Sequence, residues 1–174
     1  GSDGFTVGAN NSVNKSSDSL VSWNWKANGA GSANTDGTIN TLYTSANTTS
    51  GFSISTYTGT GSAGTIGHGL GVAPKVLLVK SLANTTTWMV QHAGIGNAKE
   101  IYLNNDSAAG NSTAWNSTSP TTTVFTVTGG AGDGVNHSGD YIAYCFAEVK
   151  GFSKFGSYIG NGNANGTFVY TGFK

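Results

Sequence analysis

Short apolar segments alternate along the whole chain with connectors rich in Gly, Asn, Ser and Thr. β-Branched and aromatic residues dominate the apolar segments, as they do in the pleated, half-buried strands of β-sheets. The pattern therefore predicts an all-β fold, a β-sandwich of short antiparallel strands. The polar connector at 27–50 predicts at most a short strand at 38–43. The other predicted strands span residues 4–8, 19–27, 51–59, 75–81, 86–92, 100–104, 122–128, 140–149, 154–160 and 167–173.

The predicted strands differ in which of their faces are apolar. In "SLVSWNWKA", Val21, Trp23 and Trp25 alternate with polar residues, which predicts a strand whose tryptophans face the core and whose other face meets water. The runs "KVLLVK" at 75–80 and "YIAYCF" at 141–146 do not alternate, which is typical of central strands that are covered on both faces. Helix signals are nearly absent.

An internal repeat relates the start of the chain to its second half. The matching pairs are Phe-Thr-Val at 5–7 and 125–127, "VNKSSD" at 13–18 and "VNHSGD" at 135–140, and Gly-Phe-Ser at 51–53 and 151–153. An apolar aromatic segment follows each "VN" motif, "LVSWNW" in one copy and "YIAYCF" in the other. Such a repeat indicates repeated strand topology. We therefore predict a single domain over 1–174, with related halves near 4–120 and 124–174, of which the second is truncated.

The truncated second copy has two explanations at this point. In the first, the predicted strands within 4–27 and 151–173 complete each other's sheets, because chain termini often lie close together at the surface. In the second, the chain is a fragment of a longer repeat array. An array cut at this point leaves an open sheet edge, which favours assembly with another chain.

Charge is scarce: only 9% of the residues are charged, and the formal net charge is zero. Without a basic stripe, nucleic-acid binding has no electrostatic support. No apolar stretch is long enough for a membrane span, so we expect no membrane insertion. Cys145 is the only cysteine, which excludes an intrachain disulfide and predicts a buried, inert thiol.

The polar residues suggest neither catalysis nor a bound metal. The chain lacks the "GxSxG" motif of a nucleophile elbow, and we predict that it is not an enzyme and needs no cofactor. His68, between glycines in "GTIGHGLG", could ligate a metal; the interpretation we favour is a turn histidine bonded to nearby backbone. Asp36, Asp106 and Asp133 leave open a loop that binds calcium, although their spacing does not match an EF-hand.

Aromatic rings combined with amide and carboxylate side chains could recognise a sugar without net charge. For both Trp88 and Trp115 we favour a core position; of the two, Trp115 is the better candidate for an exposed position, because it lies in the polar run "GNSTAWNSTSP". The predicted ligand-binding residues are Trp115, Trp88, Tyr102, Asn104, Asn105 and Asp106.

Several long motifs together resemble a known domain of unknown function. They include "DGFTVG", "VSWNWKANGAG", "GFSISTYTGTG", "TIGHGLGVAPKVLLVK", "GDYIAYCFAEVKGFSKFGSYIGNG" and "TFVYTGFK". The domain they resemble recurs in tail-fibre-like and other structural proteins of tailed bacteriophages, many of them marine. The resemblance covers essentially the whole chain and implies no catalytic residues.

The resemblance implies a virion or extracellular location and a receptor-binding role without catalysis. The expected partners are a host cell-surface glycan or envelope protein and other virion proteins, and fibre analogy implies a homo-oligomer, a trimer. A structural spacer or decoration domain that only assembles with other virion proteins is the alternative. A bacterial surface adhesin carrying a phage-derived domain is a third, minor one.

Overall fold

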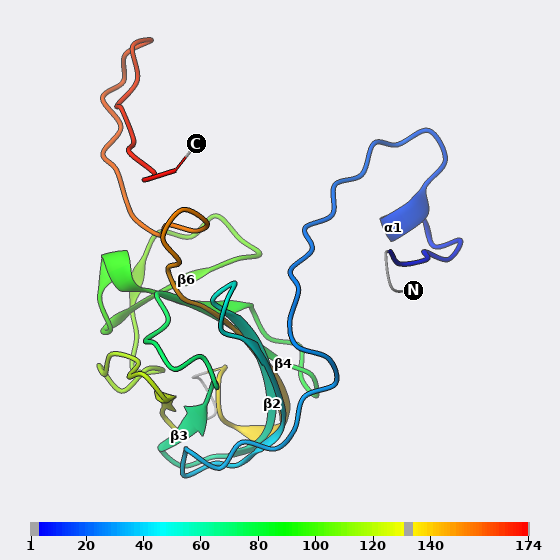
Figure 1. The fold of residues 1–174 in the computed structure, drawn as a ribbon, viewed down its shortest axis with the longest axis vertical. Coiled ribbons are helices and arrows are strands. Elements are labelled where there is room, and N and C mark those ends of the chain that lie inside the picture. The colour runs from blue at the N-terminus through cyan, green and yellow to red at the C-terminus, as the bar shows by residue number, and fades with distance from the viewer. Residues whose placement is uncertain (1–3, 131–133, 174) are drawn as a thin grey trace.

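The computed structural model describes residues 4–130 and 134–173 and is an all-β sandwich, as predicted (Figure 1). The larger sheet is antiparallel and consists, in spatial order, of β1 (Thr41–Asn47), β2 (Phe52–Thr60), β9 (Ser138–Phe146), β4 (Val76–Ser81), β5 (Met89–His92), β6 (Lys99–Tyr102) and β7 (Gly110–Asn111). The smaller sheet pairs β3 (Gly64–Gly67) with β8 (Val124–Val127). A 3₁₀ turn, η1 (Ala93–Ile95), follows β5.

The centre of the larger sheet consists of β9 and its two neighbours. β9 pairs with β2 from Phe52↔Phe146 to Thr60↔Ser138, and it pairs with β4 on its other side. Side chains of β9 therefore alternate between the inner core, where Tyr141, Ala143 and Cys145 are buried, and the outer face, where Ile142 and Tyr144 are half-buried. This confirms that the non-alternating runs "KVLLVK" and "YIAYCF" form central strands, although their outer face is only partly covered.

The core lies between the two sheets. Trp115, Tyr57, Tyr141 and Phe125 are its largest side chains, and none is more than 1% exposed. The Tyr57 and Tyr141 rings stack with centroids 5.4 Å apart, and Phe125 meets Tyr57 edge-on. Burying each such side chain contributes about 1.5–3 kcal/mol, so these residues supply much of the stability of the sandwich.

The motif "VNHSGD" holds the turn between β2 and β3. Asn136 is fully buried; its Oδ1 accepts from the Thr60 N–H at 2.9 Å, and its Nδ2 donates to the Ser62 carbonyl at 2.6 Å. Its own carbonyl accepts from the Gly61 N–H at 3.0 Å. Because all these groups find partners, the turn can leave the larger sheet and deliver β3 to β8.

Four predicted strands, at 4–8, 19–27, 154–160 and 167–173, are not strands in the structure. They lie in two exposed, extended segments that project from the sandwich, which we call the N-terminal arm (residues 4–25) and the C-terminal arm (residues 154–173) (Figure 1). The N-terminal arm contains the four-residue helix α1 (Asn11–Asn14). An extended segment becomes a strand only where a neighbouring strand takes up its N–H and C=O groups.

The arms contradict one expectation about the core. Trp23 and Trp25 were predicted to face the core, but they are 79% and 52% exposed. In the described part of the chain, the N-terminal arm has no sheet packed over it that could bury them. Among the described residues, no β-ladder links the two arms, and their projecting parts lie apart (Figure 1). None of the helices in the described ranges has the length and hydrophobicity of a membrane-spanning segment.

Replacing Asn136 with Ala is expected to lower the free energy of unfolding by about 1–3 kcal/mol, because it removes the two hydrogen bonds that this buried amide makes with the Thr60 N–H and the Ser62 carbonyl, each contributing about 0.5–1.5 kcal/mol. Urea titration followed by tryptophan fluorescence measures the change. Asn40→Ala, at an exposed position, is the matched control and should change stability by less than about 0.5 kcal/mol. Equal effects of the two substitutions would contradict the proposed role of Asn136.

Candidate functional site

The fold separates the six residues predicted to bind a ligand. Trp115, the better candidate for an exposed ring, is instead fully buried in the core between the sheets together with Ala114, as the favoured core interpretation predicted. The polar run around it forms a turn that carries the indole inward, and the Ala114 carbonyl accepts from the Thr128 N–H at 2.9 Å. Polar neighbours in the sequence therefore flank a core residue, so Trp115 offers no surface to an external ligand.

Trp88 and Tyr102 lie on opposite faces of the larger sheet. Tyr102 is opposite Met89 in the ladder and packs against the inner core, with its hydroxyl donating to Glu100. Trp88 precedes Met89, so its side chain points outward, and its ring lies 6.0 Å from the ring of Tyr144. These two aromatic side chains therefore cannot form one sugar-binding platform.

Part of the predicted site does lie together at the edge near β6. The Oδ1 of Asn104 accepts from the Trp88 N–H at 2.9 Å, which ties the loop after β6 to the start of β5. Asn105 and Asp106 follow in the same exposed loop. Of the predicted residues, Asn104 is therefore held beside the half-buried Trp88, and Asn105 and Asp106 follow it in the chain.

His68 is a turn histidine, as the favoured interpretation predicted. It is buried; its Nδ1 accepts from the Leu70 N–H and its Nε2 lies 3.2 Å from the Thr121 carbonyl. With Nδ1 as acceptor, the ring is neutral and carries its proton on Nε2. Burial lowers the pKa of His68 below 6.5, against the opposing effects of the Thr121 hydrogen bond and the Asp36 charge.

Other reactive groups are also held in structural positions. Cys145 is buried, and its burial raises the pKa of the thiol to about 12. Across the described ranges, no three His, Cys, Asp or Glu side chains gather where they could hold a metal ion. Asp133, one of the possible calcium ligands, lies outside the described residues.

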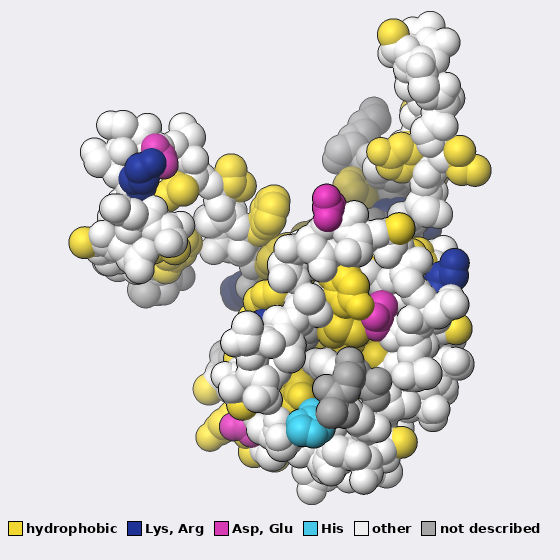
Figure 2. All heavy atoms as spheres, turned by 180° about the vertical axis from the view of Figure 1, so that it is seen from behind, with side chains coloured by type: hydrophobic (Ala, Val, Ile, Leu, Met, Phe, Trp, Pro, Cys, Tyr) yellow, Lys and Arg dark blue, Asp and Glu magenta, His cyan; other side chains and the backbone are white. Residues whose placement is uncertain are grey.

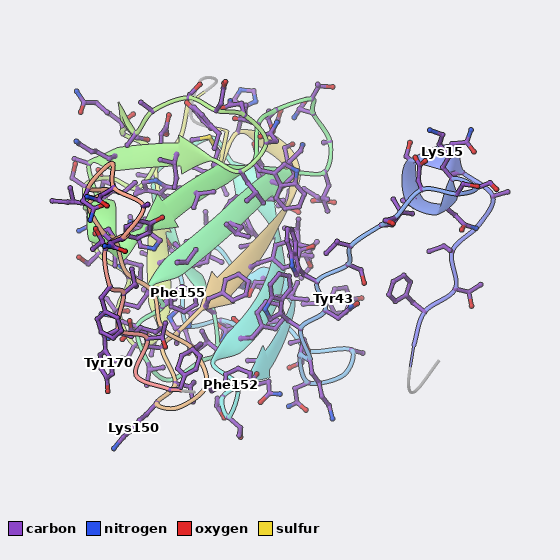
Figure 3. All side chains as sticks on the ribbon, turned by 90° about the horizontal axis from the view of Figure 1, so that it is seen from above. Lys15, Tyr43, Lys150, Phe152, Phe155 and Tyr170 are labelled. Atoms are coloured by element: carbon purple, nitrogen blue, oxygen red, sulfur yellow. The ribbon has the colours of Figure 1, made fainter. Side chains whose placement is uncertain are left out.

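The structure contains a groove that the sequence did not predict, on the outer face of the larger sheet. It has a volume of about 570 Å³ and lies where both arms leave the sandwich. We call it the aromatic groove; its main apolar lining residues are Trp25, Phe52, Val76, Leu78, Phe146, Phe152, Phe155 and Phe173. Figure 3 labels Phe152 and Phe155, which come from the segment that follows β9.

Phe146 organises the aromatic groove. Its ring lies 5.0 Å from Phe52, 5.3 Å from Trp25 and 6.2 Å from Phe155, so side chains from the sheet and from both arms meet on it. Such aromatic pairs add about 0.5–1.5 kcal/mol each to the effect of burial. Trp25, the last residue of the N-terminal arm, and Phe155, near the start of the C-terminal arm, are therefore attached to the sheet, while most other arm residues are exposed.

A polar contact fixes the start of the C-terminal arm beside the groove. The Phe155 N–H donates to Glu148 at 3.1 Å, and Lys154 approaches the same carboxylate at 3.4 Å. The Phe155 hydrogen bond is the main cause that lowers the pKa of Glu148, with Lys154 adding to it. The arm therefore leaves the sandwich at a defined place.

The family model described as "Domain of unknown function (DUF7483)" matches residues 1–174. The chain belongs to this family. No curated protein and no solved structure shows a significant match to it. Because the family has no described function, the indications of function come from the aromatic groove, the arms and the edge around Trp88.

The neutral, buried His68 is expected to make stability depend on pH. The unfolded chain takes up a proton below pH 6.5, whereas the folded ring resists it, so this stabilisation is complete above 6.5 and is lost as the pH falls below that value. His68→Asn is expected to cost about 1–3 kcal/mol at neutral pH, because the Thr121 carbonyl loses its donor.

Urea titrations from about pH 8 to about pH 5 measure both effects. The difference in unfolding free energy between the native chain and His68→Asn should shrink below pH 6.5. A difference that stays constant over this range would show that His68 does not cause the pH dependence.

Proposed function

We propose that the chain is a non-enzymatic assembly domain of an extracellular, virion-associated structure, in which it joins like units through its arms. The main observation behind this proposal is the apolar surface on the arms. Trp23 is 79% exposed, and Ile159 and Phe168 are each 87% exposed. Hydrophobic side chains gather where both arms project from the sandwich (Figure 2). Large apolar side chains left exposed on both arms favour a protein interface there.

Electrostatic attraction does not explain how the arms would bind a partner. With 9% charged residues and no net charge, the chain has little electrostatic means of steering a partner. Burial of apolar area is then the main source of binding free energy, and it needs a partner surface that is itself apolar. A like unit with the same arms supplies one.

The polar residues that catalysis would need have structural contacts instead, which supports a non-enzymatic role. Glu100 accepts hydrogen bonds from Tyr102 and Ser112, and Asp140 accepts from the Thr58 hydroxyl at 2.7 Å. The virion setting is supported by the resemblance of the long motifs to domains of phage structural proteins. A homotrimer, implied by the fibre analogy, stays a prediction.

Sedimentation velocity over a range of protein concentrations tests assembly. The native chain should form oligomers as its concentration rises, and Trp23→Ser combined with Phe168→Ser should shift the midpoint of association at least about tenfold higher, because apolar area is lost. Tyr43→Ser is the matched control, since Tyr43 is 61% exposed on β1 of the sandwich. A native chain that stays monomeric at every concentration would contradict the proposal.

Contact with a host-surface glycan is the second candidate function, favoured by the edge where Asn104 is hydrogen-bonded to Trp88 and is followed by Asn105 and Asp106 in an exposed loop. A sugar ring could stack on a half-buried indole while the loop supplies hydrogen-bond partners. The expected partner is a bacterial surface polysaccharide.

Binding of the labelled chain to extracted bacterial surface polysaccharides tests this second candidate. Trp88→Ala should reduce binding by about tenfold, in line with loss of one aromatic contact of about 1–1.5 kcal/mol, while Tyr43→Ala should leave it unchanged. Trp115→Ala is unsuitable as a probe because loss of this core residue destabilises the fold by about 3–5 kcal/mol. No saturable binding, or equal binding by Trp88→Ala, would remove the glycan candidate.

A further inference from the structure

We propose that the N-terminal arm of one copy pairs with the C-terminal arm of a second copy, in the register that joins β9 to β2 and β8 to β3 within the sandwich. The inference rests on the proposed assembly function and specifies which segments of two copies pair. We call this pairing of two arms the joint. It follows from comparing the internal repeat with the contacts that the repeated motifs make in the folded part of the chain.

The N-terminal arm repeats the segment from β8 to β9. Phe5-Thr6-Val7 matches Phe125-Thr126-Val127 of β8, and "VNKSSD" matches "VNHSGD". "LVSWNW" then matches "YIAYCF" of β9, so that Trp23 and Trp25 correspond to Tyr144 and Phe146. The arm thus contains two strand sequences whose counterparts are paired in the sandwich.

The segment that leads into the C-terminal arm repeats β2, its turn and β3. Gly151-Phe152-Ser153 matches Gly51-Phe52-Ser53, Tyr158 matches Tyr57, and Gly166-Thr167-Phe168 matches Gly64-Thr65-Ile66. One extra residue lies between Phe152 and Tyr158, which a β-bulge accommodates. The C-terminal arm thus carries the counterparts of the strands that β9 and β8 pair with.

Pairing in the sandwich predicts the register of the joint. Phe52 is opposite Phe146 and Tyr57 is opposite Tyr141, and in the smaller sheet Thr65 is opposite Thr126. The corresponding pairs in the joint are Phe152 with Trp25, Tyr158 with Leu20, and Thr167 with Thr6.

The "VN" motif gives a second indication that the N-terminal arm pairs with a C-terminal arm. Asn136 makes three hydrogen bonds with the turn between β2 and β3, and the Tyr57 hydroxyl donates to the Val135 carbonyl. The equivalent Asn14 is exposed; its Nδ2 donates to the nearby Gly8 carbonyl at 3.0 Å and its N–H donates to the Asn10 carbonyl at 2.9 Å, both within the N-terminal arm. The turn it would hold, "GNGNANG" at 160–166, is present in the C-terminal arm.

Burial of the matched residues agrees with this pairing. Phe125, Ile66 and Tyr57 are each 0% exposed, whereas their counterparts Phe5, Phe168 and Tyr158 are 62%, 87% and 69% exposed. The same residue types at the same repeat positions are thus core in one copy and exposed in the other. Pairing of the arms converts this exposed apolar area into a small core.

A second copy is the partner because the two arms of one chain project from the sandwich in different directions (Figure 1). Lys15, near the far end of the N-terminal arm, lies well away from the sandwich (Figure 3). Each copy offers one arm of each kind, so the contact is heterologous and generates a ring or an open head-to-tail chain.

Disulfide trapping between two single-cysteine variants tests the register. Thr6→Cys and Thr167→Cys place thiols at the predicted pair, and Cys145 is buried and does not compete. When the two variants are mixed and oxidised, we expect a cross-linked dimer at about tenfold or more the yield of Thr6→Cys mixed with Thr171→Cys, because the paired arms hold the thiols at high effective concentration. The substitutions lie in exposed arms, so the sandwich itself folds in every variant.

Asn14→Ala is the companion variant. It should raise the concentration at which copies associate by about tenfold, as expected for loss of buried hydrogen bonds, and should leave the unfolding free energy of the sandwich unchanged. A double variant, Thr6→Cys with Thr167→Cys, that cross-links only within one chain would overturn pairing with a second copy.

The experiment separates failure of the joint from failure of the proposed function. Oligomers in solution with no preference for the predicted cysteine pair, or with no effect of Asn14→Ala, overturn the register and leave assembly standing. A chain that is monomeric at every concentration overturns both.

Discussion

Strand β9 is hydrogen-bonded along nine residue pairs to β2 on one side and along six to β4 on the other. Because its side chains alternate between the faces, the same strand supplies Tyr141, Ala143 and Cys145 to the inner core and Tyr144 and Phe146 to the outer face. The larger sheet, the inner core and the aromatic groove therefore all depend on this one strand and its register.

The motif immediately before β9 determines how the sandwich closes. Asn136 satisfies the polar groups of the turn after β2, and this turn directs β3 away from the larger sheet to pair with β8. Trp115 and Phe125 are buried between the two sheets as a result. A polar side chain with all its hydrogen bonds satisfied is thus a condition for the hydrophobic core.

The arms repeat sequence motifs of the sandwich but lack the neighbouring strands that those motifs have there. The counterparts of Val13 and Asn14 in "VNHSGD", Val135 and Asn136, are buried in the sandwich, and the counterpart of "LVSWNW" is its central strand, yet in the N-terminal arm both motifs are exposed. Strand propensity describes how well a side chain fits a half-buried sheet, so it has little effect on a segment that has no neighbouring strand. The likeness of the two copies and the difference in their burial are together the strongest argument that this chain functions by assembly.

The sequence by itself determined the fold class and the central strands, because the apolar runs at 75–81 and 140–149 must be buried whichever strands they pair with. It also determined the structural role of His68 and the repeat. Only the tertiary structure decided that Trp115 is core, that Trp88 and Tyr102 point to opposite faces, and that Trp23 and Trp25 are exposed. Each of these depends on which strands become neighbours, and such long-range pairing is not encoded in the local pattern of apolar and polar residues.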